Sequence, residues 1–154
     1  MQKIQSFRIN HDVLMPGIYV SRVDGDITTY DLRTRRPNAG DYMDLVTMHS
    51  VEHMIATLIR NSDMADDVIY FGRMGCQTGF YLLVRNADNL RVLSTLKTCL
   101  RQTIEHDGPV FGASAVECGN YKCLDIDAAK KECRRYLTVL EEIGTPDFKY
   151  RNNK

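Results

Sequence analysis

The sequence predicts an α+β domain of two layers, a mainly antiparallel sheet with helices packed on one of its faces. Segments rich in β-branched and aromatic residues come in pairs, which indicates hairpins. Longer segments carry apolar residues at helical spacing, and strands and helices do not alternate regularly as they would in a parallel βαβ fold. Because the chain has 154 residues and domains average ~150, residues 1–154 are expected to form a single domain.

Four strands are predicted in two pairs. Residues 17–23 and 26–33 flank the dipeptide Asp24-Gly25, which is typical of a tight hairpin turn. Residues 68–71 and 79–84 form the second pair, on either side of a glycine-bearing segment over residues 72–79. The sheet is therefore expected to be built from two antiparallel units.

Three helices are predicted from the spacing of apolar residues, over about 41–61, 90–106 and 127–143. Asp127 is the predicted N-cap of the last helix, and Gly144 and Pro146 are its stop signals. Cys99 and Cys133 lie among leucines at helical spacing, so both are predicted to be buried core residues.

The composition argues against several classes of protein. Twenty basic residues cancel twenty acidic ones, which disfavours broad binding to nucleic acid or to an anionic membrane. No segment approaches the ~20 apolar residues of a membrane span, and the first residues lack the apolar core of a signal peptide. We therefore expect a cytoplasmic protein. Five cysteines in a reducing compartment indicate free thiols, metal ligands or catalysis rather than disulfides.

Residues 49–53 carry the most informative motif, H-x-x-E-H. Residues four apart on a helix lie about 40° apart around its axis, so His49 and His53 leave the same face. Two such imidazoles commonly hold a divalent cation. Glu52 lies at the edge of that face and can act as an acid or base. A half-exposed helix with solvated side chains is the structural alternative.

A catalytic metal usually has three protein ligands, so a third must come from elsewhere. Cys118 and Cys123 lie in an irregular segment rich in glycine and cysteine, and the residue types alone favour Cys118 only modestly. His11 and His106 are further candidates, although His106 ends a predicted helix, where capping is the usual role. The chemistry of the residues leaves this choice open.

Cys76 belongs to a second candidate constellation. It lies beside Gly75 in the connection between two strands, where a cysteine can be exposed to a small substrate. A nearby metal or basic group would favour its thiolate. A lone cysteine in a turn is, however, more often structural.

These motifs closely resemble those of the S-ribosylhomocysteine lyases, the LuxS family, over nearly the full length. The resemblance depends on an ordered set of segments rather than on a single match. These segments are Ser6-Phe-Arg-Ile-Asn-His11, Tyr30-Asp-Leu-Arg33 with Pro37-Asn38, His49–His53, Met74–Gly79 and Glu117-Cys118-Gly119.

The resemblance implies a role for each of these positions. It makes His49, His53 and Cys118 the metal ligands, which selects Cys118 over Cys123. Glu52 and Cys76 become the two acid/base residues. The same resemblance implies that three further residues seat the substrate, namely Ser6, His11 and Arg33.

The family resemblance also implies a reaction, a metal and an assembly. The reaction cleaves the thioether of S-ribosyl-L-homocysteine by carbonyl migration and β-elimination. The products are L-homocysteine and 4,5-dihydroxy-2,3-pentanedione, the autoinducer-2 precursor, which links the family to quorum sensing and the methionine cycle. One divalent metal is expected per subunit, Fe(2+) in the native enzyme with Zn(2+) or Co(2+) as alternatives. Family members are homodimers with active sites at the subunit interface.

One position departs from the family pattern. Tyr70 stands where many members have an aspartate associated with substrate binding, so no substrate role is transferred to it. Two other classes of protein fit parts of the sequence. An inverted H-x-x-E-H helix also occurs in some metallopeptidases, but that class does not explain Cys76. A small metal-binding or thiol-sensing module would use Cys118 and Cys123, yet the paired C-x-x-C units of structural zinc sites are absent from the sequence.

Overall fold

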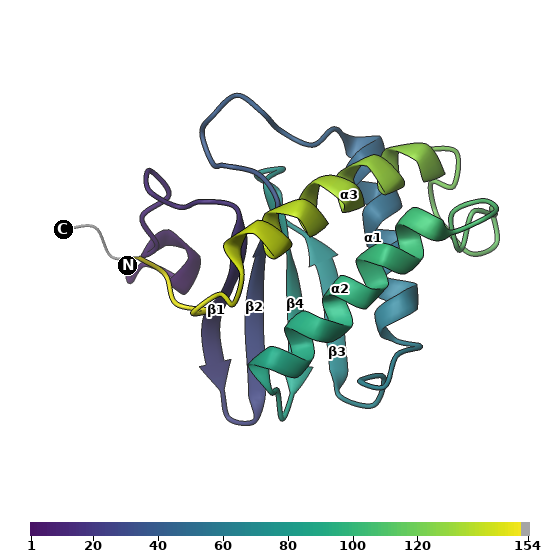
Figure 1. The fold of residues 1–154 in the computed structure, drawn as a ribbon. Helices are drawn as coiled ribbons and strands as arrows, with labels where there is room; N and C mark the ends of the chain where they lie inside the picture. Colours follow the sequence, from purple (N-terminus) through teal and green to yellow (C-terminus); the bar gives the residue numbers. More distant parts are fainter. Residues whose placement is uncertain (152–154) are drawn as a thin grey trace.

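The computed structural model describes residues 1–151 and confirms the predicted α+β class. A four-stranded sheet forms one layer and the helices form the other, covering a single face of the sheet (Figure 1). The elements in chain order are the short 3-10 helix η1 (Gln5–Phe7), β1 (Gly17–Asp24), β2 (Ile27–Arg33), α1 (Leu45–Ile59), β3 (Val68–Arg73), β4 (Gly79–Arg85), α2 (Asn89–Glu105) and α3 (Ile126–Ile143).

The sheet is antiparallel throughout, with the strand order β1-β2-β4-β3. Each predicted hairpin forms, and the two are joined where β2 pairs with β4. In that pairing Arg33 lies opposite Gly79. A Cβ atom at Gly79 would lie 2.5 Å from the carbonyl oxygen of Leu32, so glycine permits the close approach of these strands.

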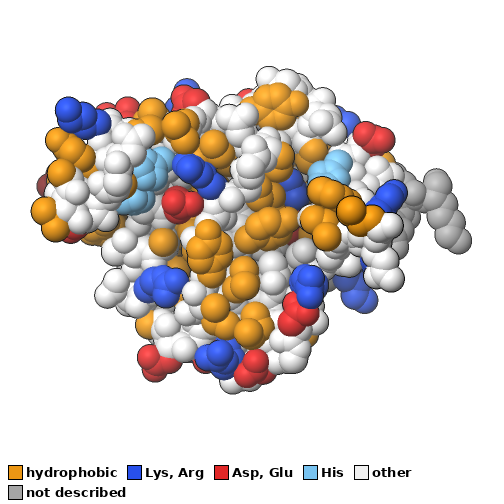
Figure 2. Space-filling view, turned by 180° about the vertical axis from the view of Figure 1, so that it is seen from behind, with side chains coloured by type: hydrophobic (Ala, Val, Ile, Leu, Met, Phe, Trp, Pro, Cys, Tyr) orange, Lys and Arg blue, Asp and Glu red, His pale blue; other side chains and the backbone are white. Residues whose placement is uncertain are grey.

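Strand alternation sends one set of side chains into the core and the other to the uncovered face. On β4, Phe80, Leu82 and Val84 are buried against the helices. Tyr81 and Leu83 alternate with them and therefore face the other way. Figure 2 shows that uncovered face, where hydrophobic side chains gather over the middle of the sheet.

Each of the three α-helices begins at an aspartate whose side chain accepts a backbone N–H of the first turn, as helix N-caps do. The caps are Asp44, Asp88 and Asp125. The prediction that Asp127 caps the last helix is wrong. Asp125 has an extended backbone, so its carboxylate can turn back to the N–H groups of Asp127 and Ala128, whereas Asp127 already lies inside the first turn.

The core between the sheet and the helices contains the two cysteines expected there. Cys99 and Cys133 are each 1% exposed, which confirms that prediction. Burial raises the pKa of both thiols from 9.0 to about 12, so both stay protonated at neutral pH. Neither sulfur is therefore available as a thiolate nucleophile.

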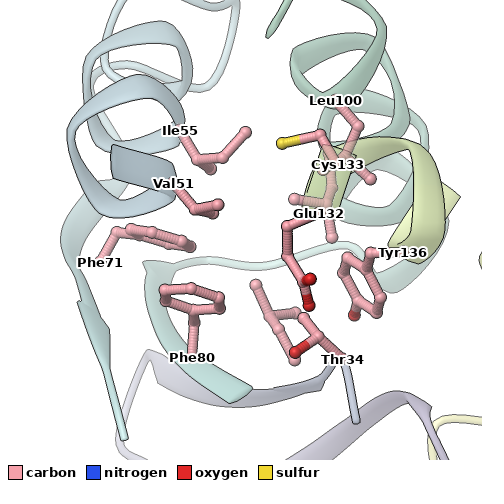
Figure 3. Close-up of a pocket in the computed structure, with 11 residues that line it drawn as sticks. Thr34, Val51, Ile55, Phe71, Phe80, Leu100, Glu132, Cys133 and Tyr136 are labelled. Atoms are coloured by element: carbon pink, nitrogen blue, oxygen red, sulfur yellow. The ribbon is translucent and has the colours of Figure 1, made fainter. Parts of the chain in front are cut away.

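A cavity of about 10 Å³ lies within this core, among side chains of the sheet and helices (Figure 3). It can hold at most about one water molecule, so it is not a substrate site. Glu132 extends from α3 into this region and is nearly fully buried. Arg35 neutralises it through two hydrogen bonds, of 2.6 and 3.1 Å, and thereby anchors the segment after β2 to α3. Within residues 1–151, no helix has both the length and the apolar character needed to cross a membrane.

Candidate metal centre and adjoining thiol site

Helix α1 presents the H-x-x-E-H motif at the margin of the core. Its apolar face, which includes Met48 and Val51, packs inward, so His49, Glu52 and His53 are left half-buried on the adjoining face. The two imidazole rings lie 4.6 Å apart and are perpendicular to each other. The predicted geometry of the motif is therefore present.

Backbone carbonyls orient both rings. Nδ1 of His49 lies 2.9 Å from the carbonyl oxygen of Cys123, and Nδ1 of His53 lies 2.8 Å from that of Phe111. Because a carbonyl only accepts, Nδ1 is assigned as the protonated nitrogen in each ring. Each Nε2 then carries a lone pair, as a metal ligand requires, and the second hydrogen bond fixes the ring.

Cys118 completes a group of three. Its Sγ lies 3.4 Å from Nε2 of His49, and the ligand atoms of His49, His53 and Cys118 all lie within 4.8 Å of one another. The backbone N–H of Asn120 donates to the same sulfur at 3.4 Å, which stabilises negative charge on it. Two imidazoles and a thiolate are a donor set that suits iron(II) or zinc, so these residues could hold such an ion.

The other ligand candidates lie outside this group. Cys123 contributes its backbone carbonyl to His49 rather than its sulfur. His106 pairs with the carbonyl of Pro109, and Nδ1 of His11 pairs with that of Ile9. The residue types alone leave these side chains as possible metal ligands. Folding of the 108–125 segment back onto α1 brings Cys118, rather than these side chains, to His49 and His53.

Gly112 is a structural requirement of this segment that the sequence analysis missed. Its φ angle is +74°, in the left-handed region that favours glycine. A Cβ atom there would lie 3.1 Å from Nδ1 of His53. Gly112 therefore lets the neighbouring carbonyl of Phe111 reach that imidazole. The only signal in the sequence was a glycine between Phe111 and Ala113, within an irregular segment.

Glu52 connects the motif helix to the strand that leads to Cys76. Its carboxylate accepts the backbone N–H of Arg73, the last residue of β3, at 3.1 Å. This bond leaves the second carboxylate oxygen free for proton transfer. Glu52, the acid/base candidate on α1, is thus held beside the segment that contains Cys76, the other acid/base candidate.

Cys76 is exposed in the turn between β3 and β4. Its Sγ lies 3.0 Å from Oγ1 of Thr78 and 3.7 Å from Nη1 of Arg33. Nη1 also donates to Oγ1 of Thr78 at 2.7 Å, so the hydroxyl proton of Thr78 can be donated to the sulfur. Gln77, with φ of 65°, holds the turn in a left-handed conformation between these groups.

Cys76 lines a cavity of about 190 Å³ with residues from the N-terminal segment, the segment after β2 and its own turn. The others are His11, Pro37, Asn38, Tyr42, Gln77 and Thr78. Of the three predicted substrate residues, His11 thus lies in the same cavity as Cys76, and Arg33 contacts the sulfur. Ser6 lies in η1, and no hydrogen bond of its side chain to these groups occurs within residues 1–151.

Arg33 is 1% exposed and is held by Asp31, which is fully buried. Nη2 and Nε of the guanidinium donate to the two carboxylate oxygens at 2.7 and 3.1 Å. Burial lowers the pKa of Arg33, but the hydrogen bonds and charge of Asp31 outweigh it and raise the pKa overall. The charge beside Cys76 is therefore permanent. Asp31 was missed, although its place two residues before Arg33 on one strand face was a readable signal.

The metal group and the thiol cavity form two separate clusters. Cys76 does not belong to the group of three ligands, and its cavity contains none of them. Tyr70, the departure from the family pattern, lies on the uncovered sheet face and is 53% exposed. A Cβ atom at Gly72 would lie 2.2 Å from its hydroxyl, so the ring of Tyr70 extends over that glycine.

The fold and these two clusters define a class: an α+β protein with a group of two histidines and a cysteine that could hold a metal ion, and with an exposed cysteine beside an arginine. The family model described as S-Ribosylhomocysteinase (LuxS) matches residues 4–145. The chain is 43% identical to the S-ribosylhomocysteine lyase of Clostridium beijerinckii, over 99% of this chain and 100% of that protein. The corresponding lyases of Finegoldia magna and Borreliella afzelii are 42% and 40% identical, each over 97% of this chain and 99% of the relative. The chain belongs to the S-ribosylhomocysteinase (LuxS) family.

Proposed function

We propose that this protein is a metal-dependent S-ribosylhomocysteine lyase that releases L-homocysteine and 4,5-dihydroxy-2,3-pentanedione. The observation that carries the proposal is the grouping of His49, His53 and Cys118 within 4.8 Å, in a chain that matches the lyase family over residues 4–145. The thioether cannot simply be hydrolysed, so the sugar carbonyl must first migrate toward the carbon that bears sulfur. β-Elimination then breaks the carbon–sulfur bond without a redox cofactor.

His49, His53 and Cys118 are the proposed ligands of one divalent ion per subunit. Iron(II) is the proposed native metal, with zinc or cobalt able to replace it in the same donor set. Such an ion supplies Lewis-acid stabilisation of negative charge on substrate oxygens. The chain itself orients both imidazoles through the carbonyls of Phe111 and Cys123 and so holds the ligands ready.

Glu52 and Cys76 are the proposed proton carriers. Carbonyl migration requires a proton to leave one carbon and another to arrive at its neighbour, so two groups of moderate acidity on different elements serve it well. Glu52 is fixed by the N–H of Arg73 and keeps one oxygen free. Cys76 is exposed to its cavity and lies against the charge of Arg33, which stabilises negative charge on the sulfur between proton transfers.

Ser6, His11 and Arg33 are the proposed substrate-seating residues. The shared cavity supports this role for His11, and the contact with Cys76 supports it for Arg33. For Ser6 the support is its position in the N-terminal motif of the family. We place the reaction in the cytoplasm, with a small-molecule substrate and with neither nucleic acid nor membrane as a partner. Of the two products, 4,5-dihydroxy-2,3-pentanedione serves as an autoinducer precursor for quorum sensing, and homocysteine returns to the methionine cycle.

We further propose that the functional unit is a homodimer formed through the uncovered sheet face. Helices cover one face of the sheet, whereas the other carries hydrophobic side chains in its centre (Figure 2). Tyr70, Tyr81 and Leu83 point to that side. An exposed apolar sheet face of this kind is a typical interface between subunits.

The decisive experiment measures thiol release from S-ribosylhomocysteine by the iron-loaded protein. A thiol-reactive dye reports homocysteine, and protein in which the ion has been removed by a chelator serves as the control. The expected result is turnover that depends on the metal and returns when iron(II) is added back. A folded, metal-loaded protein that releases no thiol would overturn the proposed function.

A further inference from the structure

The C-terminal tail, meaning the described residues after α3, contacts the aspartate that holds Arg33 beside Cys76. Residues after α3 pass along β1, where the carbonyl of Phe148 accepts the N–H of Val20 at 2.7 Å. The Phe148 ring is 5% exposed and packs edge-on against Tyr30. Phe148 adopts a φ of 60°, which costs a non-glycine residue conformational energy. The buried ring offsets that cost and fixes the tail in place.

This anchor places Tyr150 on the uncovered side of the sheet, where its ring stacks on Tyr19 with centroids 5.0 Å apart. Its hydroxyl donates to Oδ2 of Asp31 at 2.7 Å. Burial and the charge of Asp31 both raise the pKa of Tyr150, so the hydroxyl keeps the proton that it donates. Tyr150 lies beyond residue 145, the last residue that the family model matches.

Asp31 connects this tyrosine to the site. The same Oδ2 atom accepts Nη2 of Arg33 at 2.7 Å, while Oδ1 accepts Nε. The remaining arm of the guanidinium, Nη1, faces Thr78 and the sulfur of Cys76. A carboxylate fixed by three donors cannot rotate without breaking one of them, so its orientation determines where the guanidinium points.

We propose that Tyr150 is a positioning residue of this site: by donating to Asp31 it holds Arg33 in register with the sulfur of Cys76. The inference about catalysis rests on the proposed function, in which Cys76 carries protons. The orientation of Arg33 is a property of the protein alone and can be measured without turnover.

The test compares Tyr150→Phe with Tyr19→Phe in the full-length, iron-loaded protein. Both variants keep two stacked aromatic rings, but only the first removes the hydroxyl that contacts Asp31. The hydroxyl of Tyr19 instead donates to the carbonyl of Met15, which makes this variant the matched control. Melting temperatures identify any general loosening of the sheet face.

Three readouts are expected to change in Tyr150→Phe and to stay at the wild-type level in Tyr19→Phe. The kcat for thiol release should fall about tenfold, with KM within about twofold, because one hydrogen bond to a buried carboxylate is lost. Alkylation of Cys76 by iodoacetamide, followed by mass spectrometry at fixed pH, should slow. The Arg33 Nε–H signal in NMR spectra should exchange faster with water.

Wild-type alkylation and NMR behaviour in Tyr150→Phe would overturn the proposal, as would an equal change in Tyr19→Phe. Should Tyr150→Phe fail to fold, the wild-type protein can still refute the proposal, because an Arg33 Nε–H that exchanges as fast as that of an exposed arginine would exclude a fixed guanidinium. If wild-type protein releases no thiol, the proposed function fails, whereas alkylation and NMR continue to test the role of Tyr150.

Discussion

The carboxylate of Glu52 accepts the backbone N–H of Arg73 at 3.1 Å and so joins helix α1 to the end of β3. The bond crosses from the helix that carries the candidate metal ligands to the strand that leads to Cys76. Because the donor is a backbone N–H, the bond does not depend on the side chain of Arg73. It therefore gives Glu52, the proposed proton carrier on α1, a fixed position.

Glu52→Gln should separate proton transfer from structure. The amide oxygen of glutamine can still accept the N–H of Arg73, but the side chain no longer ionises. We expect metal content and melting temperature to stay near the wild-type values while thiol release falls by about 10²–10⁴-fold. Elemental analysis and the thiol assay measure the two effects. Glu52→Gln protein with wild-type turnover would remove Glu52 from the mechanism.

The two cysteines of the 108–125 segment should differ in their effect on metal binding. Cys118→Ala removes the sulfur that lies 3.4 Å from His49 and should strip most of the metal. Cys123→Ala is the matched control, because His49 uses only the backbone carbonyl of that residue, which alanine retains. Metal-to-protein ratios after dialysis are the measurement. Similar ratios in both variants would contradict the assigned ligand set.

Gly112→Ala should damage the metal centre without removing a ligand. The new Cβ atom would press on His53, and alanine is strained at a φ of +74°, at a cost of about 1–3 kcal/mol. We expect a lower melting temperature and weaker metal retention against a competing chelator. Gly119→Ala is the control, since a Cβ there meets no atom within 4 Å. Wild-type retention in Gly112→Ala would show that the Phe111 carbonyl does not orient His53.

The uncovered sheet face gives a prediction about assembly. Leu83→Asp places a charge on the uncovered face, on the inner strand β4, and should dissociate the proposed homodimer, because an unpaired carboxylate is costly to bury. Analytical ultracentrifugation at assay concentrations measures the mass. Lys97→Asp is the control: it lies on helix α2, which covers the opposite face of the sheet, and should leave the homodimer intact. A wild-type protein that sediments as a fully active monomer would refute this prediction.

Stability at alkaline pH should depend on the buried thiols. The pKa of Cys99 and of Cys133 rises from 9.0 to about 12 on folding, so between these values the unfolded chain releases protons that the folded chain retains. The contribution of these thiols to the free energy of unfolding is therefore fully present below pH 9. It falls as pH rises toward 12, by up to about 1.4 kcal/mol per pH unit per thiol. Urea unfolding under reducing conditions at pH 8 to 11 measures the slope. The double variant Cys99→Ala, Cys133→Ala should show a flatter slope, and an unchanged slope would exclude these groups.

The sequence alone determined the local features of this protein. Apolar periodicity identified the helices and the strands, and the four-residue spacing of His49 and His53 was enough to place both on one helix face. Such features depend on residues close together in the chain. The same reasoning erred by two residues at the start of α3, because Asp125 and Asp127 differ only in the backbone conformation that decides which one caps.

Tertiary structure decided how the distant segments meet. The pairing of β2 with β4 brings Arg33 opposite Gly79 and hence close to Cys76, and folding of the 108–125 segment brings Cys118 to His49 and His53. The packing of the tail places Tyr150 against Asp31, 119 residues away in the chain. No local pattern encodes these contacts. They follow from the burial of one shared core, in which the register of each segment is set by all the others.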